Sequence, residues 1–93
     1  MRLWVIAYDI ASDSRRYRLA VHLGTRMNRV QESVFEGWLH APEMREILEG
    51  ARALIDEAQD QIRAYPLAMR TSGRCTVMGM QEMTAPTPNY WIL

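Results

Sequence analysis

The hydrophobic and polar positions of this chain follow two periodicities, and each predicts a different kind of element. An almost uninterrupted apolar run over residues 3–10 predicts a strand buried on both faces, because a central strand shows little alternation. Residues 29–39 form a second extended region, in which the apolar face changes partway. This change indicates either one long strand with a bulge or two short strands. Gly37 within it marks a bulge or a close approach of two backbones.

Two segments with apolar residues at helical spacing accompany these strands. The first helix is expected over residues 14–27, after a group of residues that favour helix starts: Ser12, Asp13 and Ser14. Its apolar stripe is expected to contain Tyr17, Ala20 and Val21, with Leu19 and Leu23 beside them. The second helix is expected from Pro42 to about Ala58, on a core stripe formed by Met44, Ile47, Leu48, Ala51, Leu54 and Ile55.

The last part of the chain predicts shorter elements. Residues 62–69 read as a strand that Pro66 confines to a sheet edge, and residues 75–80 as a short last strand. The order β-α-β-β-α-β, with an extra C-terminal strand, is typical of a ferredoxin-like α/β sandwich with both helices on one face. We therefore expect a ferredoxin-like domain over residues 1–80 and a C-terminal arm over residues 81–93.

Length and composition limit the classes of function. A chain of 93 residues forms one domain with a thin core, which dimerisation would strengthen. Its 11 basic and 11 acidic residues cancel, which excludes a histone-like binder but not a local basic patch. A single cysteine, Cys75, excludes an intrachain disulfide and a cysteine-based zinc site. The N-terminal apolar run is shorter than the roughly 20 residues of a membrane span and lacks a cleavage site, so we expect a cytoplasmic protein without membrane contact.

The arginines carry the strongest charge signal. All 11 basic residues are arginine, which either reflects genome composition or suits phosphate binding, since the guanidinium fork matches phosphate. Arg15, Arg16 and Arg18 lie in the first turns of the first expected helix, where cations oppose the helix dipole. A nearby anion would offset that cost. An exposed, solvated cluster is the alternative, and the pattern leaves both open.

Asp9 is the first candidate for chemistry, because it ends the opening strand, where a charge can be both held and exposed. Mg²⁺ often takes only one or two carboxylates plus waters, so one Asp per chain suffices if a two-fold axis pairs two copies. The alternative is that Asp9 caps the following loop or pairs with an arginine. The hydroxyl of Ser33 could contact a phosphate, although a position in the sheet explains this residue equally well.

Four segments in this order resemble the smaller of the two core CRISPR adaptation proteins. They are residues 5–10, the helix start with Asp13, Arg15, Arg16, Leu19 and Ala20, residues 29–37, and residues 62–67. Each segment alone is weak evidence. Their order and spacing in a chain of this length make the resemblance specific, and it covers residues 3–80.

The resemblance implies a ferredoxin-like homodimer in which the last strand crosses to the partner's sheet. It implies that paired Asp9 residues bind Mg²⁺ or another divalent cation, and that the dimer is a metal-dependent endonuclease acting on RNA or on double-stranded DNA. Its main implied role is spacer acquisition, in which the dimer scaffolds the adaptation integrase and holds double-stranded DNA. The implied or candidate phosphate contacts are Arg15, Arg16, Arg18, Ser33 and Arg74, with Arg63 and Arg70 as weaker ones.

Two other hypotheses stay open at the level of sequence. One is a toxin-like metal-dependent endoribonuclease on the same fold, with Asp9 essential and no integrase partner. The other is a small dimerisation module whose arginines are merely solvated. The arm over residues 81–93 is proline-containing and ends in an apolar tetrapeptide, which suits docking on the integrase by strand addition.

Overall fold

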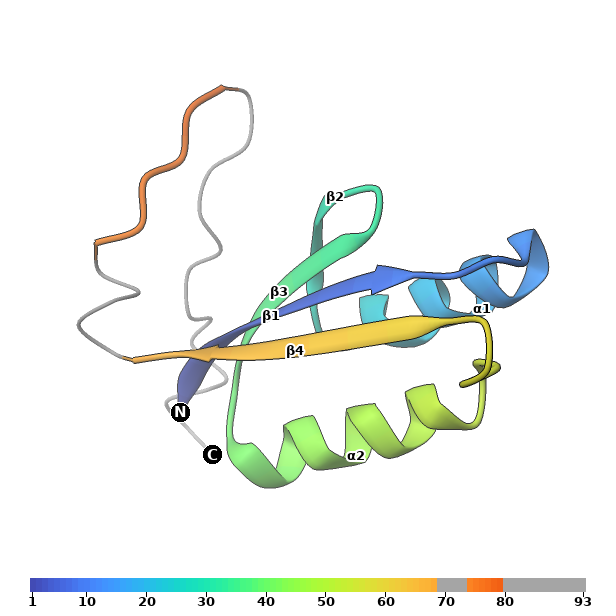
Figure 1. The fold of residues 1–93 in the computed structure, drawn as a ribbon. Coiled ribbons are helices and arrows are strands. Elements are labelled where there is room, and N and C mark those ends of the chain that lie inside the picture. Colours follow the sequence, from blue (N-terminus) through green and yellow to red (C-terminus); the bar gives the residue numbers. More distant parts are fainter. Residues whose placement is uncertain (69–73, 80–93) are drawn as a thin grey trace.

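The computed structural model describes residues 1–68 and 74–79, in which one antiparallel sheet carries two helices on one face (Figure 1). Along the chain the elements are β1 (Arg2–Asp9), α1 (Asp13–Gly24), β2 (Asn28–Gln31), β3 (Val34–Leu39), α2 (Ala41–Arg52) and β4 (Gln61–Leu67). This arrangement confirms the predicted ferredoxin-like sandwich.

The sheet has the strand order β2-β3-β1-β4, so β1 lies in its interior. Ile6 of β1 lies opposite Phe35 of β3 on one side and Ala64 of β4 on the other. Pro66 lies opposite Trp4 on β4, which is an edge strand of this sheet. The restriction that Pro66 imposes is therefore confirmed, because a residue without an N–H group is tolerated at a sheet edge.

β1 is buried more strongly on one face than on the other, which corrects the prediction of burial on both faces. Ile6 and Tyr8 belong to the hydrophobic core under the helices, whereas Val5 and Ala7 are only half-buried. The reason is that both helices cover the same face of the sheet (Figure 1). We call the other side the helix-free face; its residues on β1 and their register partners are Leu3, Val5, Ala7, Asp9, Val34, Glu36, Trp38, Gln61, Arg63, Tyr65 and Leu67. Leu3 is fully buried on this face, so the weaker burial concerns its part around Val5 and Ala7.

α1 begins one residue earlier and ends three residues earlier than predicted. Its N-cap is Ser12, whose Oγ accepts the Arg15 amide at 3.3 Å, so Asp13 is not the cap. Its buried residues are Leu19 and Leu23, whereas the predicted stripe members Tyr17 and Val21 are 72% and 54% exposed. The predicted stripe was wrong for Tyr17 and Val21, whereas Ala20 packs against the core as expected. Both pairs have the i,i+4 spacing, so the pattern alone could not select the core face.

α2 ends at Arg52, earlier than the predicted Ala58, although Met44, Ile47 and Ala51 form its buried side as expected. The Asp56 amide donates to Oδ2 of Asp60 at 2.8 Å, so it does not continue the helical ladder. The Asp60 amide in turn donates to the Asp56 carbonyl at 2.7 Å. The α-helical pattern has already ended before Asp56, because the Leu54 amide donates to the Ala51 carbonyl at 2.9 Å, three positions back. The Asp56–Asp60 contacts then hold the loop that follows α2.

The extended region over residues 29–39 forms two short strands with a register shift between Arg29 and Gln31, which confirms one of the two predicted alternatives. Gly37 is a close approach, since a Cβ there would lie 3.3 Å from the Arg26 carbonyl oxygen and 3.2 Å from Met27 Cγ. The backbone before β2 therefore passes directly over β3.

The predicted last strand over residues 75–80 is wrong for residues 75–79, which form no strand in this structure. A strand needs a neighbour to accept and donate its backbone hydrogen bonds, and these residues pair with no strand of the described chain. Residues 69–73 and the arm over residues 81–93 lie outside the described residues, and so does Arg70. In the part of the chain that is described, no helix has the length and apolar character to cross a lipid bilayer.

Candidate phosphate and metal site at the end of β1

A small open pocket lies where β1 ends beside the turn between β2 and β3. Its volume is about 180 Å³, and it is lined by Tyr8, Asp9, Ile10, Arg16, Glu32 and Ser33. The structure therefore brings together Asp9, Arg16 and Ser33, which sequence reasoning singled out separately. Tyr8, Ile10 and Glu32 were not predicted as members of this site.

Asp9 presents an exposed carboxylate at this pocket. It has the strand parity of Val5 and Ala7 and therefore lies on the helix-free face. Among the described residues, its side chain makes no hydrogen bond or ion pair. The alternative interpretation of Asp9 as a loop cap or an arginine partner is therefore not supported.

Arg16 reaches the pocket from the first turn of α1. Its Nη2 donates to the Ile10 carbonyl at 2.9 Å, and its Nη1 donates to Oδ1 of Asp13 at 2.6 Å. The Asp13 side chain is 97% exposed, so water competes with this ion pair and the pair stabilises the fold little. Arg16 is thus oriented by a carbonyl while its charge stays available for an anion.

Arg15 points elsewhere, although it is the adjacent residue. Its Nε and Nη2 donate to the two carboxylate oxygens of Asp60 at 2.8 and 3.2 Å, and its side chain is only 24% exposed. Successive helical residues project about 100° apart, so neighbouring arginines face different surroundings. The contact of Arg15 with a DNA backbone stays a prediction, and this geometry argues against it because the guanidinium fork is already occupied.

Asp60 is the acceptor that sequence reasoning missed. Its side chain is fully buried, and it accepts the Ala11 amide at 2.9 Å and the Asp56 amide in addition to Arg15. The hydrogen bond from Arg15 holds the pKa of Asp60 well below its ordinary value; burial opposes this, and the two amides lower the pKa further. No sequence signal marks it, because Arg15 and Ala11 are 45 and 49 positions away.

Two carbonyls hold the turn between β2 and β3, and the first is that of Ser33, which accepts the Tyr8 amide at 3.1 Å. The Glu32 oxygen accepts the Tyr8 hydroxyl at 3.0 Å and Arg29 Nε and Nη2 at 3.2 and 2.7 Å. Arg29 also lies over the ring of Phe35, 5.7 Å from its centroid, and Tyr8 stacks on the same ring. These contacts fix the position of Ser33 at the wall of the pocket.

The remaining predicted contacts lie apart from this pocket. Arg18 is exposed on α1, where Nε donates to the Ser14 carbonyl at 3.3 Å. Arg74 is exposed in a turn, and neither residue lines the pocket. The structure therefore does not join them with Asp9 into one site.

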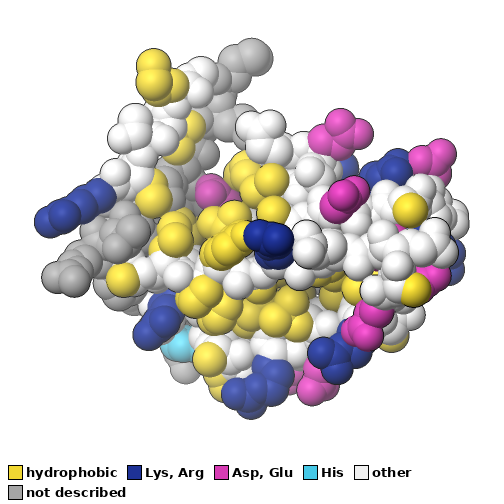
Figure 2. Space-filling model, in the orientation of Figure 1, with side chains coloured by type: hydrophobic (Ala, Val, Ile, Leu, Met, Phe, Trp, Pro, Cys, Tyr) yellow, Lys and Arg dark blue, Asp and Glu magenta, His cyan; other side chains and the backbone are white. Residues whose placement is uncertain are grey.

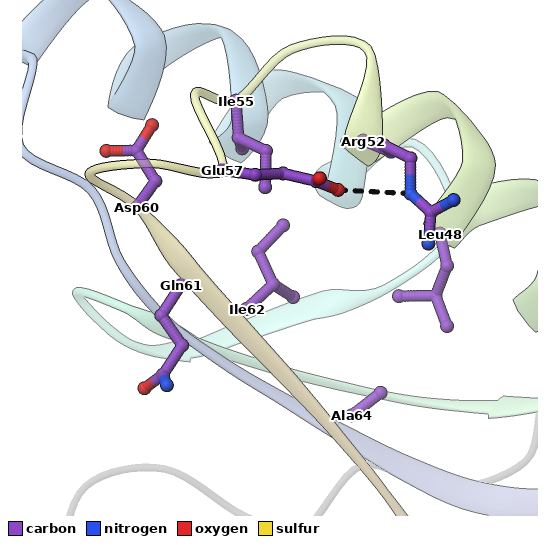
Figure 3. Close-up of a pocket in the computed structure, with 8 residues that line it drawn as sticks. All are labelled: Leu48, Arg52, Ile55, Glu57, Asp60, Gln61, Ile62 and Ala64. Carbon is purple, nitrogen blue, oxygen red and sulfur yellow. Dashed lines mark ion pairs between the residues drawn. The ribbon is translucent and has the colours of Figure 1, made fainter.

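A larger groove of about 380 Å³ lies between α2 and β4 (Figure 3). Leu48, Ile55, Ile62 and Ala64 give it an apolar lining, and the hydrophobic band between these elements is visible in Figure 2. Among the charged groups that line it, Arg52 pairs with Glu57 at 3.2 Å, and Asp60 pairs with Arg15. These paired charges leave the groove without a group suited to phosphate or metal chemistry.

Comparison with known proteins then decides the family. The family model described as CRISPR associated protein Cas2 matches residues 1–75. The chain belongs to the Cas2 family. A Cas2 relative from Thermus thermophilus, named CRISPR-associated endonuclease Cas2 2, is 42% identical over 79 residues, which are 85% of this chain and 83% of the relative.

Further Cas2 relatives agree over nearly the full length. A Synechocystis protein named CRISPR-associated endoribonuclease Cas2 3 is 37% identical, covering 92% of this chain and 94% of its own. A solved chain from a partial Cas6-RT-Cas1–Cas2 complex superposes with a TM-score of 0.71 at 25% identity, covering 95% of this chain and 99% of that one. The resemblance to the CRISPR adaptation family is confirmed.

Proposed function

We propose that this Cas2-family chain acts in CRISPR spacer acquisition, as a homodimer that binds double-stranded DNA and scaffolds the integrase. We include in this proposal a Mg²⁺-dependent endonuclease centre at paired Asp9. The observation that carries it is the pocket at the end of β1, where an unpaired carboxylate and an oriented guanidinium line one opening. A phosphodiester needs a cation for its oxygens and a group that can hold a metal, and both are present there.

The phosphate contacts of this proposal rest on Arg16 first. Its side chain is 36% exposed, and its acidic partner Asp13 is a solvent-facing carboxylate that a phosphate could replace. Arg18 and Arg74 are exposed and extend the contact outside the pocket. Such contacts supply affinity without reading the base sequence, which suits a protein that holds DNA fragments of any sequence.

The residues of the pocket fit a hard divalent cation, although one chain supplies few ligands for it. No group of three or more His, Cys, Asp or Glu residues is arranged for a metal within the described chain. Asp9 is exposed and unpaired, and Mg²⁺ accepts one or two carboxylates with waters filling the other positions. A second copy that brings its own Asp9 to the same place would complete the donor set.

The chain's own residues would then divide the work of phosphodiester hydrolysis. A bound divalent cation supplies an activated water and neutralises charge on the phosphate oxygens. Asp9 holds that cation, and Arg16 orients the phosphate and stabilises its developing charge. Ser33 contacts a phosphate oxygen from the opposite wall, on a turn that the Glu32 carbonyl keeps rigid.

The helix-free face is the surface through which we propose that the second copy packs. Val5, Ala7 and Val34 lie on it half-buried, and Tyr65 is 45% exposed there. Apolar side chains that are partly exposed on a sheet face gain free energy by packing against another surface. Because Asp9 lies on the same face, packing two copies through it places the Asp9 residues near each other.

The integrase partner is proposed from a relative. A chain covered to 99% by this protein was solved in a complex whose name contains both Cas1 and Cas2. Near-complete coverage means that nearly all of the backbone of that chain has a counterpart here. The arm over residues 81–93 is proposed to dock on the integrase by strand addition.

A second candidate function is endoribonuclease activity without an integrase. The name of the Synechocystis relative favours it, since that protein is called an endoribonuclease. The same pocket serves both candidates, because the phosphodiester chemistry is shared. A cleavage assay with matched RNA and DNA duplexes separates them, as does a pull-down with the integrase.

Duplex DNA binding provides the test of the proposed phosphate contacts. We expect wild-type affinity to fall steeply with salt, and Arg16→Ala to lower the slope of log K against log salt by about one per protomer, since one phosphate contact is lost. Fluorescence anisotropy with a short labelled duplex measures both quantities. Arg52→Ala is the control, because it removes an arginine of α2 that pairs with Glu57 and does not line the pocket. An unchanged slope in Arg16→Ala would contradict the proposed DNA surface.

Dimerisation through the helix-free face is tested by charge insertion. Val5→Glu should make the protein monomeric, because a carboxylate would be buried unpaired in the interface. Val21→Glu places the same change on an exposed site of α1 and should leave the dimer intact. Sedimentation equilibrium measures the mass of each variant. A dimeric Val5→Glu protein, with circular dichroism showing the wild-type fold, would place the interface elsewhere.

A further inference from the structure

Asp60 has a position and a set of contacts that the chemistry of the pocket does not explain. Among the described residues it is the only charged one that is buried, and its side chain is fully inaccessible. Burying an ionised carboxylate costs free energy unless its oxygens are satisfied. Both oxygens are: Oδ1 accepts the Ala11 amide and Arg15 Nη2, and Oδ2 accepts Arg15 Nε and the Asp56 amide.

These donors come from three places: the connection between β1 and α1, the first turn of α1, and the loop that contains Asp60 itself. Ala11 follows β1 by two positions, and Arg15 lies in the first turn of α1. The residues between the two elements form no regular structure, so no backbone ladder holds them. From a loop that precedes β4, Asp60 therefore holds the connection at Ala11 and the first turn of α1 at Arg15.

The residues that Asp60 holds are adjacent in sequence to residues that line the pocket. Asp9 lies two positions before Ala11, and Arg16 directly follows Arg15. The Ile10 carbonyl, one position before Ala11, accepts Arg16 Nη2 at 2.9 Å. Asp60 itself does not line this pocket but lies on the side of the α2–β4 groove (Figure 3). Its influence on the pocket must therefore pass through Ala11 and Arg15.

We propose that Asp60 is a positioning residue for the pocket at the end of β1. Its buried carboxylate fixes the β1–α1 connection, so that Arg16 and Asp9 face the same phosphate. The paired Arg15 belongs to this support and not to the DNA surface. The inference rests on the proposed function, because it names what organises the phosphate contact of that same site.

The salt dependence of DNA binding distinguishes positioning from mere destabilisation. A smaller folded fraction lowers apparent affinity equally at every salt concentration, whereas a lost phosphate contact lowers the slope. We expect Asp60→Asn to lower the slope by about one per protomer, as Arg16→Ala does. The double variant should show no further loss, because both changes remove the same contact. Glu57→Gln, an exposed ion-paired acid in the same loop, should keep the wild-type slope.

Two results would overturn the proposal. One is an unchanged slope in Asp60→Asn, and the other is an additive loss in the double variant. If Asp60→Asn does not fold, Arg15→Lys takes its place, since it keeps the charge but loses the bidentate fork; an unchanged slope there has the same meaning.

Amide hydrogen exchange at Ala11 gives a readout that needs no DNA. The Ala11 amide should be protected in the wild type and exchange at least about tenfold faster in Asp60→Asn, because its acceptor changes. Unchanged exchange would show that Asp60 does not hold the connection. A wild-type protein that binds no duplex would instead overturn the proposed function, while the exchange result would still decide whether Asp60 positions the connection.

Discussion

Replacing Asp9 with asparagine should reduce Mg²⁺-stimulated phosphodiester cleavage by at least about 100-fold while leaving the fold intact. The physical reason is the isolation of this carboxylate. It is exposed at the end of β1 and makes no hydrogen bond or ion pair with the described residues, so its charge serves no structural purpose there. An amide keeps the shape of the side chain but lacks the negative charge that holds a hard cation.

The assay compares cleavage of labelled duplexes with and without Mg²⁺. Glu57→Gln removes the charge of another exposed acid, away from the pocket, and should cleave like the wild type. The Asp9→Asn variant should keep duplex affinity within about twofold or bind more tightly, because a negative charge near the phosphates is removed. Activity that persists in Asp9→Asn would assign cleavage to a contaminant or to another site.

Replacing Asp60 with asparagine should lower the melting temperature near neutral pH by about 10 °C or more. The variant leaves Arg15 without its counter-charge, and the new amide group would meet N–H donors on both sides. It should also change the pH dependence of stability, which follows from the direction of the pKa shift.

The sign of that dependence is set by the folded state. Arg15 and the amides of Asp56 and Ala11 lower the pKa of Asp60 below its unfolded value of about 4. The resulting stabilisation is fully present above the unfolded pKa and is lost as the pH falls toward the folded pKa. Melting curves from about pH 7 to pH 3 should therefore show a constant difference between wild type and Asp60→Asn down to about pH 4. Below that value the difference should narrow without vanishing at pH 3, because the folded-state pKa lies lower still. Parallel curves would show that Asp60 is not the titrating group responsible, and Glu57→Gln should follow the wild type.

The local elements of the fold were accessible from the sequence because each depends on neighbouring residues. The apolar run of β1 and the regular stripe of Met44, Ile47 and Ala51 on α2 were recognised in this way. The phase of α1 was not, since Leu19 and Leu23 compete with Tyr17 and Val21 at the same spacing. Only the position of the sheet decides which pair becomes core.

The candidate site was accessible only in part. Asp9 stands out because a charge directly follows an apolar run. Arg15 and Arg16 have the same chemistry and adjacent positions, so their different environments depend on the helix phase and on Asp60. Asp60 itself is an ordinary acid in a polar loop of the sequence, and its burial comes from contacts across 45 and 49 positions. The prediction of a strand over residues 75–80 rested on local propensity alone, and residues 75–79 pair with no strand of the described chain.

The four donors around Asp60 also determine which of the two paired positions carries the acid. Two of them, the Ala11 and Asp56 amides, belong to the backbone and persist whatever the side chains are. An inverted pair, with arginine at 60 and aspartate at 15, would turn a buried cation toward two N–H groups. Many surface ion pairs tolerate charge reversal, but this pair does not. The residue types at positions 15 and 60 are therefore constrained by the main-chain amides and not only by each other.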